Sequence, residues 1–145
     1  MENKEESIKH ERSKNIRVLC VDDNVDLATM FSVMLDAEDG FESAGVLTSA
    51  DELVAEVEAK HPDVVLMDLA MPGRDPFEAM QEAARRYPET RAIVLSGYDD
   101  TERMERAIDH GAWGFVSKCG DIEQILAAIR SVAKGEMWMI RDLNR

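Results

Sequence analysis

The sequence has few cysteines, prolines and aromatic residues, and it has no long apolar run. Its two cysteines cannot build a disulfide framework, and its three histidines lie too far apart for zinc-ligand spacing. No apolar run reaches the roughly 20 residues that cross a bilayer, and the first residues do not match a signal peptide, so we expect a cytoplasmic protein with no membrane contact. The pattern Gly-x-x-x-x-Gly-Lys-Ser/Thr is also missing, which excludes a P-loop nucleotidase.

Positive charge is scarce as well. The chain has 17 Lys and Arg residues against 30 Asp and Glu residues, a net charge of −13 at pH 7. A chain this acidic repels phosphate backbones, and no basic run offsets the repulsion, so we expect no direct nucleic-acid binding. Proteins and cations are the expected partners.

The length of 145 residues allows one full hydrophobic core and hardly a second. Residues 1–14 carry charges of both signs and few apolar side chains, so we expect a flexible N-terminal tail. We expect a folded domain over residues 15–136 and a C-terminal tail, or the start of a linker, over residues 137–145. The apolar residues 137–140 either pack back on the domain or dock a partner.

Short apolar runs alternate with segments of helical periodicity. The runs at 18–21, 64–67, 92–95 and 114–116 are continuous, as strands of a parallel sheet covered on both faces require, whereas the weaker run at 41–47 suits an edge strand. Apolar residues recur with a helical period in segments 27–34, 50–57, 80–87, 104–111 and 122–129. The pattern predicts an α/β protein with a doubly wound, five-stranded parallel sheet.

Local signals indicate where the helices begin and end. Three segments resemble helix starts: Ser49-x-x-Glu52, Asp75-Pro76 and Asp121-x-x-Gln124. Glycines at 40, 111 and 135 fall where helices are expected to stop.

Polar side chains follow four of the predicted strands. Asp22 and Asp23 follow the first strand, and Asp68, Ser96 and Lys118 follow the strands at 64–67, 92–95 and 114–116. Because ligands of doubly wound sheets bind beyond the carboxyl ends of the strands, these side chains form the candidate site.

Three carboxylates on one rim repel one another, so protons or a bound cation have to neutralise part of their charge. A ligand set of oxygen atoms alone favours Mg²⁺, which commonly binds carboxylates, water and phosphate oxygens. Lys118 adds a positive charge, and the Ser96 hydroxyl can donate to a phosphoryl oxygen. An aspartate in such surroundings can attack phosphorus and form an aspartyl phosphate.

Four motifs together closely resemble the receiver domain of two-component response regulators, over about residues 16–137. They are Asp22-Asp23-Asn24, residues 68–73 (DLAMPG), residues 96–100 (SGYDD) and residues 111–118 (GAWGFVSK). The resemblance implies the flavodoxin-like (βα)5 receiver fold with strand order 2-1-3-4-5. Residues 111–112 and 127–132 look most like receivers of the LuxR-type family, which usually carries a helix-turn-helix output.

The resemblance implies a phosphoacceptor and a metal site. Asp68 would accept a phosphoryl group from a sensor histidine kinase or a phosphotransfer protein. Asp23 and Asp68 would bind Mg²⁺ together with the backbone carbonyl of Ala70, and Asp22 would act mainly through metal-bound water.

The remaining roles implied by the resemblance concern switching. Lys118 would pair with Asp68 and then with the phosphoryl group, while Ser96 would turn inward to hydrogen-bond that group. Phe115 would be the switch aromatic, moving inward when Ser96 vacates its space. The surface that changes would include the fourth helix, the fifth strand and the fifth helix, and an unidentified downstream protein would bind it. A phosphorylation-dependent homodimer is left open.

Plainer interpretations of single residues stand beside these roles. Taken alone, Asp22 could equally be a helix cap beside Asn24, Asp68 a turn residue, and Lys118 a surface lysine. Likewise, Ser96 could be a loop hydroxyl and Phe115 a core aromatic. Cys20, inside an apolar run, reads as a small core residue.

Three functions remain in competition. The first is a phosphorylatable receiver that catalyses only its own phosphorylation and dephosphorylation. The second is an aspartyl-phosphate phosphatase or mutase. Such enzymes resemble one another in an Asp-x-Asp motif whose second aspartate is the general acid, and here Ala70 occupies that second position. The third is a receiver-like binding module that is never phosphorylated.

One departure from the family pattern affects the site. Cys119 follows Lys118 where many receivers have a proline, often in a cis bond. Because a non-proline cis bond costs about 3–4 kcal/mol, this loop could be trans and could place Lys118 differently.

Overall fold

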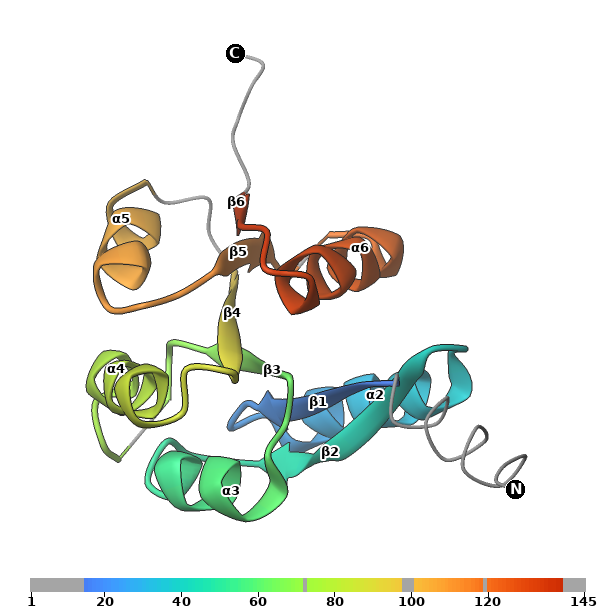
Figure 1. Cartoon of the computed structure of the whole chain (residues 1–145), viewed down its shortest axis with the longest axis horizontal. Helices are drawn as coiled ribbons and strands as arrows, with labels where there is room; N and C mark the ends of the chain where they lie inside the picture. Colours follow the sequence, from blue (N-terminus) through green and yellow to red (C-terminus); the bar gives the residue numbers. More distant parts are fainter. Residues whose placement is uncertain (1–14, 72, 98–100, 119, 140–145) are drawn as a thin grey trace, which may run out of the picture.

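A computed structural model describes residues 15–71, 73–97, 101–118 and 120–139. The predicted N-terminal tail, Asp99, Asp100 and Cys119 lie outside these residues, as does the end of the predicted C-terminal tail. The elements follow one another as β1 (Ile16–Val21), α2 (Val25–Ala37), β2 (Phe41–Leu47), α3 (Leu53–Lys60), β3 (Val64–Asp68), α4 (Pro76–Arg86), β4 (Arg91–Ser96), α5 (Thr101–Asp109), β5 (Gly114–Ser117), α6 (Ile122–Ala133) and β6 (Trp138–Met139) (Figure 1).

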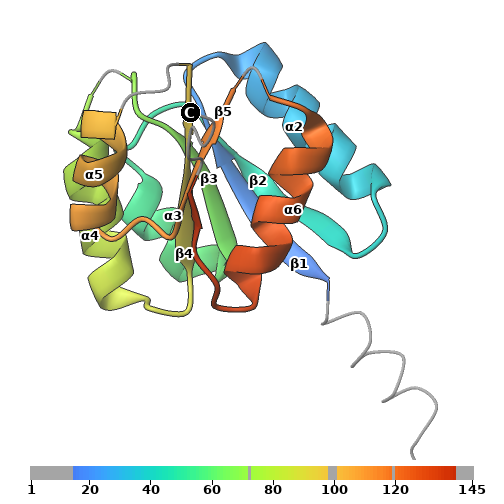
Figure 2. The same cartoon turned by 90° about the horizontal axis from the view of Figure 1, so that it is seen from above.

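The strands form one sheet in the order β2-β1-β3-β4-β5-β6, and each neighbouring pair is parallel. Helices α2 and α6 cover one face, and α3, α4 and α5 cover the other (Figure 2). The predicted α/β class and the strand order 2-1-3-4-5 are confirmed, and β6 is an addition at the end of the sheet. Within the described residues, no helix combines the length and apolar character needed to cross a membrane.

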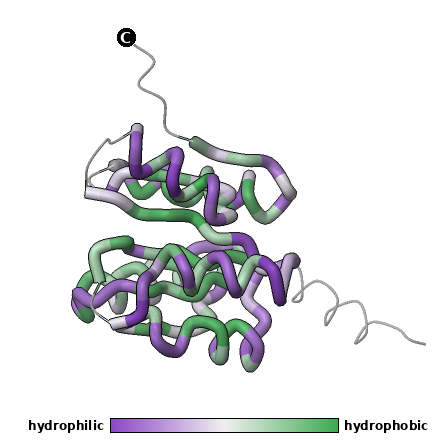
Figure 3. Tube along the Cα trace, turned by 90° about the vertical axis from the view of Figure 1, so that its left-hand side faces the viewer, coloured by the Kyte–Doolittle hydropathy of each residue, from purple (hydrophilic) through white to green (hydrophobic). Residues whose placement is uncertain are grey.

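The central strands are apolar on both sides because each side packs under a layer of helices. Alternate residues of β1 enter two different clusters, with Leu19 under α3 and α4 and Val18 under α2 and α6. The helices, in contrast, alternate between hydrophilic and hydrophobic residues along their turns (Figure 3). Burial raises the pKa of the Cys20 thiol to about 12, which keeps it protonated and confirms its place in the core.

The helix signals of the sequence are only partly correct. The Asp75 side chain accepts the N–H of Phe77 with Pro76 in the first turn, as expected. However, α3 begins at Leu53 after Glu52, so the expected capping box at Ser49 is wrong. The Ser49 hydroxyl instead accepts the N–H of Asp51, which closes a tight turn before the helix.

At α6 the side chain of Asp121 stands at the N-cap position but makes no capping hydrogen bond. The expected stops at glycine are confirmed, since Gly40, Gly111 and Gly135 all have positive φ, which residues with a Cβ rarely adopt.

The edge strand β2 also contains a bulge, where the register skips from Ser43 to Gly45.

The short strand β6 comes from the segment for which we expected a tail or linker. Trp138 pairs with Gly114 and Met139 with Phe115, and the N–H of Trp138 donates to the carbonyl of Trp113 at 2.9 Å. The side chains of Trp138 and Met139 pack on opposite faces of the sheet. These two residues therefore pack back on the domain and cover the outer edge of β5.

Gly114 allows β6 to approach closely. A Cβ at this position would lie 3.0 Å from Ile93 Cγ1 and 3.2 Å from the Trp138 carbonyl oxygen. We therefore expect Gly114→Ala to push β6 away and to lower the free energy of unfolding by about 1–3 kcal/mol, measured by chemical denaturation. Gly97→Ala is the matched control, because a Cβ there would meet nothing within 4 Å. Equal stability of the two variants would contradict the prediction.

Candidate metal and phosphoryl site

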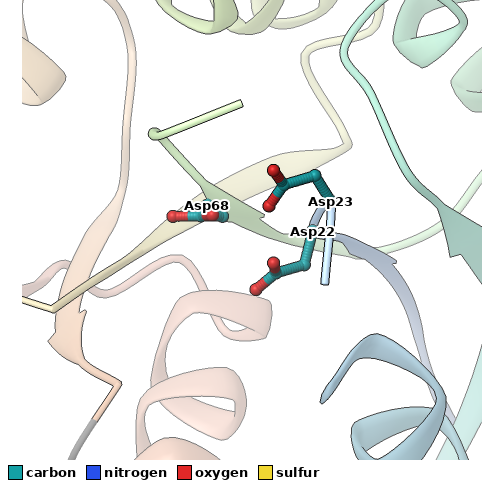
Figure 4. A group of neighbouring side chains, drawn as sticks. All are labelled: Asp22, Asp23 and Asp68. Atoms are coloured by element: carbon teal, nitrogen blue, oxygen red, sulfur yellow. The ribbon is translucent and has the colours of Figure 1, made fainter. Parts of the chain in front are cut away.

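Three aspartates meet where β1 and β3 end. Val21 pairs with Met67 at the end of the β1–β3 ladder, so the residues that follow on each strand come out side by side. One carboxylate oxygen from each of Asp22, Asp23 and Asp68 lies within 4.8 Å of the others (Figure 4). Asp22 and Asp68 are 2% and 5% exposed, whereas Asp23 is exposed to solvent. The structure thus brings the three predicted carboxylates together.

Lys118 reaches this cluster from the end of β5. Its Nζ atom lies 3.2 Å from Asp22 Oδ2 and 3.3 Å from Asp68 Oδ2, so one ammonium group bridges two buried carboxylates. The backbone N–H of Lys118 donates to the carbonyl of Ser96 at 2.8 Å, which fixes the start of its loop. The family resemblance predicted that Lys118 pairs with Asp68. Its contact with Asp22 was missed, because the sequence does not show which carboxylates the lysine side chain contacts.

The pKa values reflect burial first and charge second. Burial raises the pKa of the Asp68 carboxyl above its ordinary value; the N–H of Ala70 at 3.3 Å and the Lys118 ammonium lower it, and Asp22 raises it. For Lys118, burial alone would lower the pKa, but the two carboxylates outweigh it and the net shift is upward. Lys118 is therefore charged at neutral pH. For Asp68, burial and the neighbouring Asp22 carboxylate disfavour the ionised form.

The residues present fit a hard divalent cation. Asp22 Oδ2 is buried and, among the described residues, has the Lys118 ion pair but no aligned hydrogen-bond donor. With all groups ionised, three carboxylates against one ammonium leave an excess of negative charge at the rim. Carboxylate oxygens with excess negative charge are suitable ligands for Mg²⁺. Because Asp23 is exposed to solvent, a Mg²⁺ ion bound here could also keep several of its water ligands.

Asp22 is not the cap of the following helix. The Asn24 side chain occupies the N-cap position of α2 and accepts the N–H of Leu27 at 3.1 Å. The Asp22 carboxylate accepts the N–H of Asn24 through its other oxygen, at 2.9 Å. This bond orients Asp22 so that Oδ2 faces Lys118, and the plainer alternative of a capping Asp22 is wrong.

Ser96 and Phe115 lie on the two strands between Asp68 and the outer edge of the sheet. Ser96 is 3% exposed at the end of β4, next to Ser117 in the β4–β5 ladder. Phe115 is 2% exposed and packs in the cluster under α3, α4 and α5, to which Met139 of β6 also contributes. The side chain is thus buried as a core aromatic, and its role as a switch stays a prediction.

Sequence reasoning also missed a contact made by the loop that follows Asp68. The N–H of Arg74 donates to Asp51 Oδ1 at 2.8 Å, although 23 residues separate the two. Asp51 gave no signal in the sequence, because one more acidic residue in an acidic chain looks like an ordinary solvated charge.

Comparisons with known proteins agree with this geometry. The family model described as the response regulator receiver domain matches residues 18–130. The chain is 32% identical over 130 residues to the oxygen regulatory protein NreC of Staphylococcus haemolyticus, and the match covers 89% of this chain and 60% of that protein. The chain therefore spans about three fifths of the length of this curated relative.

Solved structures of similar fold include two from response regulators. The signal receiver domain of the putative response regulator NarL from Mycobacterium tuberculosis matches with a TM-score of 0.78 and 27% identity, over 85% of this chain and 99% of that one. A LuxR-family two-component response regulator from Aurantimonas sp. SI85-9A1 matches with a TM-score of 0.81 and 24% identity, over 88% of this chain and 91% of that one. The chain, with its acidic cluster and bridging lysine at the carboxyl end of a parallel sheet, belongs to the response regulator receiver domain family.

Proposed function

We propose that Asp68 is the phosphoacceptor of this receiver and that Asp22, Asp23, Asp68 and the Ala70 carbonyl bind Mg²⁺ during the reaction. One observation carries the proposal: the buried Asp68 carboxylate has a lysine ammonium at 3.3 Å and clusters with two further carboxylates. A carboxylate that attacks phosphorus needs positive charge beside the equatorial oxygens of the entering phosphoryl group, and Lys118 together with a cation at the three carboxylates would provide it.

The proposed donor is a phosphohistidine on a sensor histidine kinase or a phosphotransfer protein. An oxygen of Asp68 attacks phosphorus in line, so an O–P bond forms while the P–N bond breaks and its electron pair returns to the donor imidazole. A cation held by Asp22, Asp23 and Asp68 would supply positive charge to the phosphoryl oxygens. Lys118 then exchanges its contact with Asp68 for one with a phosphoryl oxygen, and the Ser96 hydroxyl donates to another.

The product of this step is a signal and not a released compound. The receiver catalyses only its own phosphorylation and dephosphorylation, in the cytoplasm, and the change is transmitted through Ser96 and Phe115 to the surface of α5, β5 and α6. The partner at that surface is a downstream protein, a further domain of a longer regulator, or a second phosphorylated copy. Similarity to LuxR-type receivers favours an output domain that binds DNA, while this acidic receiver itself does not.

Two competing functions have less support. A phosphatase or mutase acting through an aspartyl phosphate needs a general acid two residues after the nucleophile, and Ala70 has no such group. A receiver-like module that only binds a partner has no need of all of Asp23, Asp68 and Lys118, yet all are present.

Incubation with acetyl phosphate and Mg²⁺ tests the proposal. We expect the intact mass to rise by one phosphoryl group, and hydroxylamine to remove it, because an acyl phosphate is cleaved by that nucleophile. A chelator and the Asp68→Asn substitution should each abolish the gain. Asp109→Asn is the matched control, since Asp109 is an exposed aspartate at the end of α5 and its loss removes the same charge elsewhere. A gain that persists in Asp68→Asn would rule out Asp68 as the acceptor.

The raised pKa of Asp68 predicts a pH-dependent stability. Well below the ordinary pKa of 3.8, Asp68 is protonated in both the folded and the unfolded chain. As the pH rises, the unfolded chain loses this proton first, so the folded state loses stability until the pH passes the raised folded pKa. With chelator present, Asp68→Asn should therefore unfold at a higher temperature than wild type at pH 7 and not at pH 3.

Added Mg²⁺ should make wild type unfold at a higher temperature than Asp68→Asn at pH 7. At a free concentration 100 times the Kd, binding adds about 2.7 kcal/mol to wild-type stability, and Asp68→Asn should gain much less. Thermal unfolding followed by circular dichroism measures both effects. A wild-type melting temperature that does not change when Mg²⁺ is added would contradict the proposed metal site.

A further inference from the structure

The loop between β3 and α4 is held at its far end by a carboxylate from another part of the chain. Asp51, in the turn before α3, accepts the N–H of Arg74 at 2.8 Å. The neighbouring Gly73 has a φ of +87°, and a Cβ there would lie only 2.7 Å from the same oxygen of Asp51. The Asp51 carboxylate thus occupies space that only a glycine leaves free.

Both partners in this contact are themselves braced. The N–H of Asp51 donates to the Ser49 hydroxyl at 3.2 Å, which holds the turn that presents the carboxylate. The Arg74 guanidinium donates to Glu82 of α4 at 2.5 Å, and Glu82 also accepts from Arg86 at 3.1 Å. The end of the loop is therefore fixed between the start of α3 and the second turn of α4.

The near end of the same loop forms part of the candidate site. The N–H of Ala70 donates to Asp68 Oδ1 at 3.3 Å, and the side chains of Leu69 and Met71 pack against the core under α3 and α4. Residues 69–71 and residues 73–74 of this loop are thus each held by contacts of their own, which restricts the backbone beside Asp68. Asp51 itself is not among the three clustered carboxylates, so its effect has to pass through the loop.

We propose that Asp51 is a positioning residue for phosphorylation: it holds the β3–α4 loop so that the backbone of Ala70 stays against the Asp68 carboxylate and completes the cation site. The inference rests on the proposed function, because it concerns the same site. A hydrogen bond to a charged acceptor is among the stronger ones in proteins. Its loss should lower the affinity for Mg²⁺ about fivefold to tenfold, and the rate of phosphorylation by acetyl phosphate should fall with it.

The test compares Asp51→Ala with Asp51→Asn in the full chain. Both substitutions remove the same negative charge, but asparagine keeps an oxygen that accepts the Arg74 N–H. We expect Asp51→Asn to stay within about twofold of wild type in Mg²⁺ affinity, measured by calorimetry, while Asp51→Ala shows the full loss. Glu52→Ala is the matched control for charge, since Glu52 is exposed in the same turn and its side chain makes no capping bond.

A second measurement needs no metal. Amide hydrogen exchange of a peptide covering residues 69–75, in chelator, should become faster in Asp51→Ala and should not change in Asp51→Asn or Glu52→Ala. If Asp51→Ala fails to fold, Gly73→Ala displaces the carboxylate from the loop while Asp51 remains in place, and the same loss of Mg²⁺ affinity is expected.

The possible failures are distinguishable. Equal Mg²⁺ affinity and equal exchange in Asp51→Ala and Asp51→Asn would overturn the positioning role. If wild type binds Mg²⁺ but takes up no phosphoryl group from acetyl phosphate, the proposed function loses support, whereas the comparison of the two variants still decides the role of Asp51.

Discussion

The site depends on one lysine ammonium shared by two buried carboxylates. Lys118 lies 3.2 Å from Asp22 and 3.3 Å from Asp68, so removing its ammonium would take the shared counter-charge from both buried carboxylates. The parallel sheet makes this arrangement possible, because the carboxyl ends of β1, β3 and β5 all lie at the same end of the sheet. One ammonium cannot balance three carboxylates, and this imbalance supports the proposal that the site takes a cation and then a phosphoryl group.

Much of the fold could be predicted from the sequence, because it rests on local patterns. Continuous apolar runs identified the strands, and strand ends identified Asp22, Asp23, Asp68, Ser96 and Lys118. Contacts that depend on side-chain direction could not be predicted: Lys118 with Asp22, and Asp51 with Arg74, join residues far apart in the sequence. The capping box expected at Ser49 failed because its hydroxyl closes a turn and does not cap α3.

Two features away from the carboxylates connect the site to the surface. Arg74, in the loop after Asp68, contacts Asp51 before α3 and Glu82 in α4, so this loop is held from both sides. On the other side, Phe115 is buried beside β6, where Trp138 and Met139 pack back on the edge of β5, one of the two alternatives that the sequence left open. Any inward or outward movement of this aromatic ring therefore has to be accommodated by Met139 as well as by the core.

The phosphorylation kinetics of Lys118→Met test the central claim most directly. Methionine keeps the apolar stem of the side chain and removes only the ammonium, so the phosphoryl oxygens lose their counter-charge. Removal of one such group typically costs about 10²-fold or more in rate. With acetyl phosphate and saturating Mg²⁺, the account predicts a loss of that size in Lys118→Met and none in Lys134→Met, where an exposed lysine follows α6. Equal rates for the two variants would contradict it.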